Sequence, residues 1–148
     1  MNMSLEQWAK NGWLRPHKSS KQEIADLLRI VDRDLKDAES DISSDWKFGI
    51  AYNAALKLCT ILLHASGYRP EQKLGHYRTI TSLPLVLGNE QKDNADYLDT
   101  CRGKRNTAEY DSAGAVSDHD VKELVGFVRE MRRGVMEWLQ KNHPELLR

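Results

Sequence analysis

The segment from Trp46 to Ala65 carries two apolar stripes at helical spacing, and this double pattern constrains the fold more than any other feature of the sequence. Residues three, four or seven positions apart share one face of a helix, so each stripe marks a face that another element must cover. A helix with two covered faces has neighbours on two sides, which places it at the centre of a bundle, with Gly67 as its C-terminal cap. One stripe contains Trp46, Ile50, Ala54, Leu58, Ile61, Leu62 and Ala65, and the other contains Ala51, Ala55 and Cys59.

Two other segments predict amphipathic helices with a single apolar face. Each begins with a capping box, formed by Ser20 with Glu23 and by Ser117 with Asp120, and Pro144 ends the second helix. In the first helix Asp26, Arg29, Asp32, Arg33 and Lys36 form the solvent face, so that helix is expected to pack along one side only. The apolar faces are Ile24, Leu27, Leu28, Val31, Leu35 and Ala38 in the first helix, and Val121, Leu124, Val125, Val128, Met131, Val135, Trp138 and Leu139 in the second.

The remaining helices are predicted to be shorter or less regular. Ser4 caps a short helix near the N-terminus, and the segment from His76 to Leu87 has apolar residues in helical phase, but Pro84 must kink or restart it. A further helix is expected from about Gln91 to Tyr110. The connections are short, and no segment shows β-alternation of useful length, so the residues between the helices are predicted as loops.

These elements predict an all-α fold, an up-and-down bundle of five to six helices. At 148 residues the chain is long enough to bury a real core, and we expect a single domain over residues 1–148. The four tryptophans lie within or beside apolar stripes, so they are expected to be core or interface anchors rather than a platform for stacking bases.

Charge and cysteine usage narrow the range of functions. Lys plus Arg and Asp plus Glu number 22 each, so no overall basic field favours nucleic acid, and an anionic partner must be met by a local patch. Cys59 and Cys101 lie in helical segments without a CxxC partner, which indicates buried, reduced thiols and a cytoplasmic location. We expect no secretory signal and no membrane span, because the apolar runs are interrupted by Lys57, Thr60 and His64.

No motif in the sequence predicts a cofactor or a metal ion. The glycines are scattered at helix ends instead of forming a phosphate-binding loop, and no cofactor is expected. The five histidines show no HxxxH or HExxH pairing, so no metal site is expected either.

The segment from Tyr97 to Asp111 is the candidate for chemistry, because it carries a polar arc that packing does not require. At about 100° per residue, one arc of this helix contains Tyr97, Cys101, Lys104 and Ala108, and a different arc contains Arg102, Arg105, Asn106, Glu109 and Tyr110. On spacing alone, a solvated face with i, i+4 pairs is the favoured explanation of the polar arc. A second group of cations, Arg129, Arg132 and Arg133 on the last helix, is likewise expected to be a solvated face.

The run Arg105-Asn106-Thr107-Ala108-Glu109-Tyr110, late in a helix and followed by a loop and a long last helix, resembles the HEPN superfamily. The signature of that superfamily is an arginine, commonly a polar residue after it, and a histidine four to six residues later. Arg105 and Asn106 match the first two positions, and Tyr110 stands where the histidine would be, as in HEPN branches whose motif ends in tyrosine. The resemblance extends over nearly the whole chain and implies a HEPN-like fold.

The resemblance implies a toxin-antitoxin component that binds RNA or a nucleotide-bearing partner at paired R-N-x-x-x-Y motifs across a homodimer, with metal-independent endoribonuclease activity. A minimal nucleotidyltransferase is the implied second partner. Arg105, Asn106 and Tyr110 would be the catalytic residues, and Arg102, Lys104 and Arg105 the residues that bind RNA phosphate. A phenol with a reference pKa of about 10 is protonated near neutrality and is a poor general base, so Tyr110 leaves cleavage open.

Two alternatives to catalysis remain at this point. The chain can be a non-catalytic protein-interaction module, antitoxin-like or a partner-binding subunit, in which Arg105 and Tyr110 contribute to assembly. It can also use Arg105 only as an internal brace, fixed by acidic residues of its own subunit.

Overall fold

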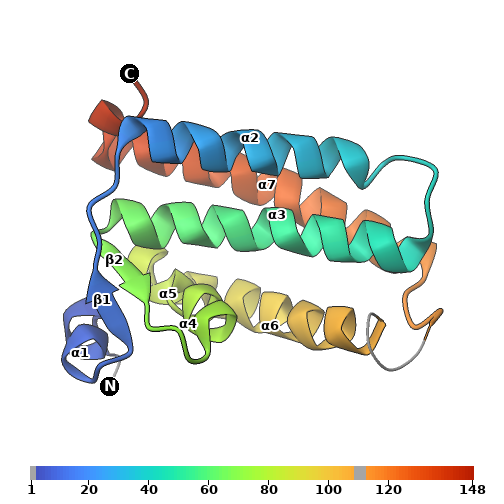
Figure 1. Cartoon of the computed structure of the whole chain (residues 1–148), viewed down its shortest axis with the longest axis horizontal. Helices are drawn as coiled ribbons and strands as arrows, with labels where there is room; N and C mark the ends of the chain where they lie inside the picture. The colour runs from blue at the N-terminus through green and yellow to red at the C-terminus, as the bar shows by residue number, and fades with distance from the viewer. Residues whose placement is uncertain (1–2, 109–112) are drawn as a thin grey trace.

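The long helices lie side by side and alternate in direction in the computed structural model, which describes residues 3–108 and 113–148 (Figure 1). The prediction of an all-α, up-and-down bundle is therefore confirmed. Serine side chains cap three of these helices, and the predicted capping box of Ser117 with Asp120 is formed. The predicted box of Ser20 with Glu23 is only half formed, because the Glu23 carboxylate pairs with two histidines instead of the Ser20 amide. The long helices are α2 (Lys21–Asp37), α3 (Ser44–Ala65), α6 (Lys92–Asn106) and α7 (Asp118–Asn142).

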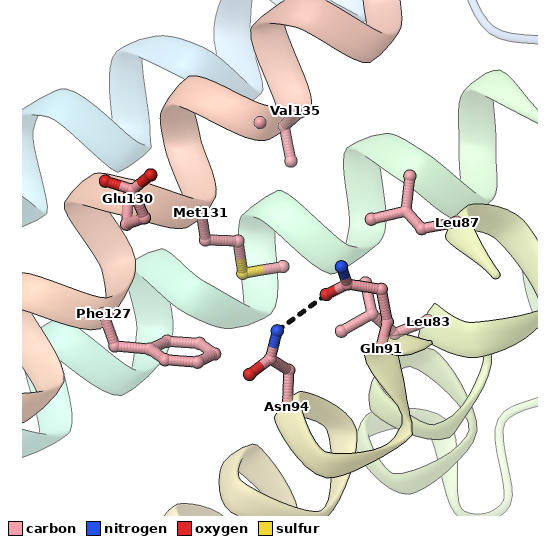
Figure 2. Close-up of a pocket in the computed structure, with 9 residues that line it drawn as sticks. Leu83, Leu87, Gln91, Asn94, Phe127, Glu130, Met131 and Val135 are labelled. Atoms are coloured by element: carbon pink, nitrogen blue, oxygen red, sulfur yellow. Dashed lines mark hydrogen bonds between the residues drawn. The ribbon is translucent and has the colours of Figure 1, made fainter. Parts of the chain in front are cut away.

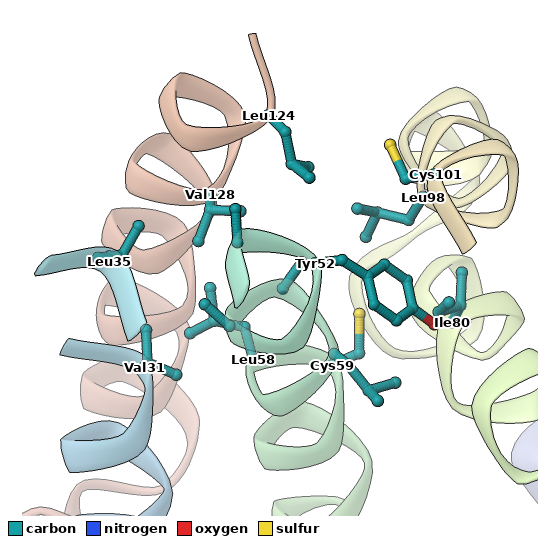
Figure 3. Packing of buried hydrophobic residues seen from close by; sticks show 14 of the residues in the cluster. Val31, Leu35, Tyr52, Leu58, Cys59, Ile80, Leu98, Cys101, Leu124 and Val128 are labelled. Atoms are coloured by element: carbon teal, nitrogen blue, oxygen red, sulfur yellow. The ribbon is translucent and has the colours of Figure 1, made fainter. Parts of the chain in front are cut away.

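Helix α3 is central, as its two stripes predict. It packs against α2 and α7 on one side and against α6 and α4 (Gly75–Thr81) on the other. In Figure 3, Leu58 faces α2 and α7, whereas Tyr52 and Cys59 point toward α6 and α4. Both cysteines are buried and free, as expected.

Trp46 does not belong to the core stripe and is 64% exposed, so the prediction for this residue was wrong. A series of i, i+4 steps drifts by about 40° at each step, because four residues turn the helix by about 400°. Over the steps from Leu58 back to Trp46 this drift reaches about 120° and carries the indole off the buried face. Ile50, one step closer to Leu58, is correspondingly half-buried.

A short two-stranded sheet joins the N-terminal arm, the segment before α2, to the bundle. Both of its strands lie in segments that were predicted from the sequence as loops. Strand β1 (Leu14–Pro16) pairs antiparallel with β2 (Tyr68–Pro70). Each strand has three residues and includes a proline, so no alternating pattern could mark it in the sequence. Helix α1 (Leu5–Lys10) is held beside β1 by a small apolar cluster, whose buried members are Trp8, Leu14 and Leu63.

The segment before α6 breaks at the predicted place. Helix α4 gives way to α5 (Leu83–Leu87) with Pro84 in its first turn, and a 3₁₀ turn η1 (Asn89–Gln91) leads into α6. Proline is tolerated there because a first-turn amide needs no intrahelical acceptor. The α-helical part of α6 ends at Asn106, and residues 107–108 are π-helical. A second 3₁₀ turn, η3 (Pro144–Leu146), follows α7.

Helix α3 is also long and apolar enough to cross a membrane, judged by length and composition alone. However, 67% of its most apolar 18-residue window is buried inside the bundle. The side chains that make this helix apolar are thus used in packing, as in the core helix of a soluble protein.

Candidate functional site

The described part of the polar arc, Arg102, Arg105 and Asn106, is half-buried and is not a plain solvated surface. Arg102 and Arg105 are half-buried, and each guanidinium lies against an aromatic ring of a neighbouring helix. The Cζ atom of Arg102 is 5.8 Å from the ring centroid of Tyr77 on α4, and that of Arg105 is 5.7 Å from the ring centroid of Tyr52 on α3. At these distances a cation is attracted by the ring face, so the rings help to fix the two arginines.

The polar neighbours of the two arginines differ. Arg102 Nε donates to Asp99 Oδ1 at 2.9 Å, and both side chains are about one-third exposed. Arg105 Nη1 donates to Asn106 Oδ1 at 3.3 Å, so the structure brings together the first two residues of the R-N motif. Tyr110 lies outside the described residues, as does Glu109, the acidic partner that spacing offered to Arg105.

Lys104 contacts α7. Its Nζ lies 2.7 Å from Asp120 Oδ2, the same carboxylate that caps the first turn of α7. The hydrogen bond from Lys104, together with those from Ser117, lowers the pKa of Asp120 to about 2. Of the three predicted phosphate-binding residues, Arg102 and Arg105 therefore share a face, while Lys104 links α6 to α7.

Tyr52 and His76 lie close to Arg105, and neither was predicted as a site residue from the sequence. The Tyr52 ring centroid is 6.4 Å from that of His76, so His76 on α4 and Arg105 on α6 approach the same ring. Tyr52 is only 1% exposed, and its hydroxyl has no hydrogen-bond partner among the residues that the structure describes. Burial raises the pKa of Tyr52 to about 12, although the charges of Arg102 and Arg105 oppose this shift.

His76 is exposed, yet its surroundings disfavour the imidazolium ion. Partial desolvation of the ring and the positive charges of Arg105, Lys57 and Arg102 lower the pKa of His76 from its usual 6.5. The imidazole is therefore neutral near pH 7 and can accept a proton. We name this group the arginine cluster; its members are Tyr52, His76, Arg102, Arg105 and Asn106.

The arginines of α7 are engaged with carboxylates. Arg132 Nε donates to Asp32 Oδ1 of α2 at 2.7 Å, and Arg129 pairs with Glu39, which follows α2. Arg133 pairs with Glu130 on its own helix. The contacts of Arg129 and Arg132 brace α7 against the α2 side of the bundle, whereas that of Arg133 stays within α7.

A second polar cluster lies at the other end of α3. His17, which follows β1, Glu23 in the first turn of α2 and His64 in the last turn of α3 converge on one another. Burial alone would raise the pKa of Glu23, but the hydrogen bonds and charges of the two histidines outweigh it and lower that pKa. This cluster could not be identified from the sequence, because its members come from three separate segments.

An open groove of about 420 Å³ lies between α7 and the segment from α5 to α6. Figure 2 shows its apolar wall, formed by Leu83, Leu87, Phe127 and Met131, and the hydrogen bond from Asn94 to Gln91 at 2.7 Å. Asn94, the residue of α6 that lines the groove, lies near the start of that helix. Arg105 lies near the end of α6, about 16 Å further along the helix axis at 1.5 Å per residue. The groove and the arginine cluster are therefore separate features.

Comparison with known proteins adds no relative: no family model, curated protein or solved structure matches this chain. The HEPN resemblance thus rests on the residues named above. The fold and the geometry of the arginine cluster are the observations on which a function can be argued.

Proposed function

We propose that this protein is a HEPN-like RNA-binding protein that holds backbone phosphate at Arg102, Arg105 and Asn106 and cleaves RNA without a metal ion. The observation that carries the proposal is the convergence of Arg105 and His76 on the ring of Tyr52. A fixed guanidinium can neutralise a phosphate, and a neutral imidazole that approaches the same ring can accept a proton. The net charge of zero requires such a local site.

In this proposal His76 is the general base in place of Tyr110, whose phenol is a poor one. The imidazole removes the proton from a ribose 2'-hydroxyl, and the 2'-oxygen bonds to the adjacent phosphorus. The bond from phosphorus to the 5'-oxygen breaks, and that oxygen takes up a proton from the imidazolium or from water. The products are a 2',3'-cyclic phosphate and a 5'-hydroxyl. Arg105 offsets the charge that develops on the phosphoryl oxygens.

The proposed base gives a signed pH dependence. Because its pKa is lowered, His76 is in the proton-accepting form at neutral pH, and activity should fall as the pH drops through a value below 6.5. Replacement of His76 by glutamine should remove this acidic limb and reduce the cleavage rate by about 10²-fold or more.

The test is incubation of tag-free protein with mixed single-stranded RNA in excess chelator, followed by end-group analysis. Arg105→Ala and His76→Gln should each abolish most cleavage, and Arg105→Ala should also weaken binding. Arg129→Ala is the matched control, because that arginine pairs with Glu39 on a different face of the bundle. Equal cleavage by Arg105→Ala and Arg129→Ala, or no cleavage by the unaltered protein, would refute the catalytic proposal.

The proposal includes the assembly that the resemblance implies. Two copies of the chain would bring their motifs together in a homodimer in the cytoplasm, and a minimal nucleotidyltransferase encoded next to this gene would be the toxin-antitoxin partner. Light scattering at micromolar concentration tests the dimer. Growth after induced expression, with and without Arg105→Ala, tests the toxin.

A second candidate function is a non-catalytic protein-interaction module, and the apolar groove beside Phe127 and Met131 favours it. If assembly through the groove is the function, Met131→Glu should break a homodimer that Arg105→Ala leaves intact. The two candidates are thus separated by which of these variants changes assembly and which changes RNA cleavage.

A further inference from the structure

The cluster of His17, Glu23 and His64 brings two imidazoles and one carboxylate to a single point. His17 Nε2 lies 2.9 Å from Glu23 Oε1 and 3.0 Å from Oε2, and His64 Nδ1 lies 2.8 Å from Oε1. One donor atom from each of the three residues falls within 4.8 Å of the other two. We propose that these three side chains form a binding site for one Zn²⁺ ion, with water as the fourth ligand.

The donor set fits this ion. Two histidine nitrogens and one carboxylate oxygen are the protein ligands of a familiar class of four-coordinate zinc sites, whereas Mg²⁺ and Ca²⁺ prefer oxygen throughout. With bonds of about 2.0–2.1 Å, tetrahedral geometry places ligand atoms about 3.3 Å apart. The observed nitrogen–oxygen separations of 2.8–3.0 Å need to widen by about 0.3–0.5 Å. The two imidazole nitrogens lie within 4.8 Å of each other and must reach the same spacing, and side-chain rotations can supply both changes.

The backbone around the cluster holds the three side chains in place. The His17 amide donates to the Gly67 carbonyl at 2.9 Å, and the Ser19 hydroxyl donates to the His64 carbonyl. Ser20 accepts from the Glu23 amide at 3.1 Å as the cap of α2. The segment after β1, the start of α2 and the end of α3 are therefore already joined before an ion binds, so little ordering entropy opposes binding.

The site is reachable from solvent without being fully exposed. The side chains of His17, Glu23 and His64 are 20%, 29% and 18% exposed, and the two imidazole rings lie 4.1 Å apart between centroids. An ion can enter and keep one water, while the partial burial strengthens its attraction to Glu23. A bound ion would connect the N-terminal arm to α2 and α3 by a second means besides the β1–β2 pairing.

This proposal does not depend on the proposed ribonuclease function. His64 lies twelve residues from Tyr52 on α3, about 18 Å along the helix axis at 1.5 Å per residue. Zinc binding should therefore change thermal stability, and RNA cleavage in chelator should be unaffected by loss of the site.

The experiment is a titration of tag-free, chelator-stripped protein with Zn²⁺, monitored by calorimetry and by the thermal midpoint, with Co²⁺ as a spectroscopic substitute. The expected result is one ion per chain at micromolar affinity or better, a rise of several degrees in Tm at saturation, and the visible absorption of four-coordinate Co²⁺. Absence of stoichiometric binding, or binding only at millimolar Zn²⁺, would overturn the proposal.

Variants locate the ion on these residues. His64→Ala should lose the Co²⁺ absorption and the Tm increase, and Glu23→Gln should weaken binding at least tenfold. The glutamine keeps an amide oxygen that can accept a hydrogen bond from one imidazole, so the Glu23→Gln variant should still fold. The control is His119→Ala, because His119 is 84% exposed and lies 3.8 Å from Glu123 in an ordinary i, i+4 pair. Binding kept in His64→Ala and lost in His119→Ala would refute the assignment.

Discussion

Replacement of Tyr52 by phenylalanine should stabilise the protein. The side chain is 1% exposed, and none of the described residues offers its hydroxyl a hydrogen bond in place of the water that folding removes. A buried polar group left unsatisfied costs about 1–3 kcal/mol. Phenylalanine keeps the ring, its apolar contacts and the face toward Arg105, and it removes only the uncompensated oxygen.

The expected gain is therefore about 1 kcal/mol or more in the free energy of unfolding, less a small loss of packing around the missing atom. For a chain of 148 residues, each kcal/mol corresponds to a change of about 2–4 °C in Tm. Urea unfolding followed by circular dichroism gives the free energy, and scanning calorimetry gives the midpoint. Tyr77→Phe is the control: its ring also faces an arginine but is only half-buried, so its change should stay within about 0.5 kcal/mol.

Loss of stability in Tyr52→Phe would refute this reasoning, because it would show that the hydroxyl is hydrogen-bonded in solution. If the variant is stabilised and also binds RNA more weakly, the unsatisfied hydroxyl is a group kept for the ligand. Such a trade of stability for binding is common at functional sites.

Two further predictions concern the bundle itself. Leu58→Ala should lower the free energy of unfolding in urea by about 2–5 kcal/mol, because Leu58 is fully buried. Trp46→Ala on the same helix should change this free energy little. Similar losses from both variants would contradict the burial of these two residues. Asp34→Ala should lower the free energy of unfolding by about 1.5–3 kcal/mol, because the carboxylate of this 5% exposed residue accepts a hydrogen bond from Asn53 at 2.7 Å. Asp32 lies in an exposed ion pair, so Asp32→Ala should cost at most about 1 kcal/mol in the same assay.

The helices could be predicted from the sequence because their determinants are local. The capping serines Ser20 and Ser117, the break at Pro84 and the two stripes of α3 all act within a few turns of the chain. The β1–β2 pairing could not be predicted, since three-residue strands far apart in sequence carry no local pattern. Trp46 was misplaced because i, i+4 spacing was extended beyond the number of steps over which it holds one face.

The candidate site was predictable only in its α6 part. Arg105 and Asn106 are neighbours in the sequence, so their polar arc is visible there, but the direction of that arc depends on how α6 rotates against α3 and α4. His76 and Tyr52 belong to those two helices and meet Arg105 only through packing. The same holds for His17, Glu23 and His64, whose approach is set by the arrangement of three segment ends.

The central position of α3 has a consequence for synthesis. During translation α2 and α3 leave the ribosome before α6 and α7, so the apolar side chains that α6 and α7 cover have no partner until most of the chain has been made. Helix α2 covers only one of the two buried faces of α3 in that interval. Nascent chains that stop before Asp118 should therefore be bound by chaperones or aggregate, and the release of α7 should be the step at which the chain becomes able to fold.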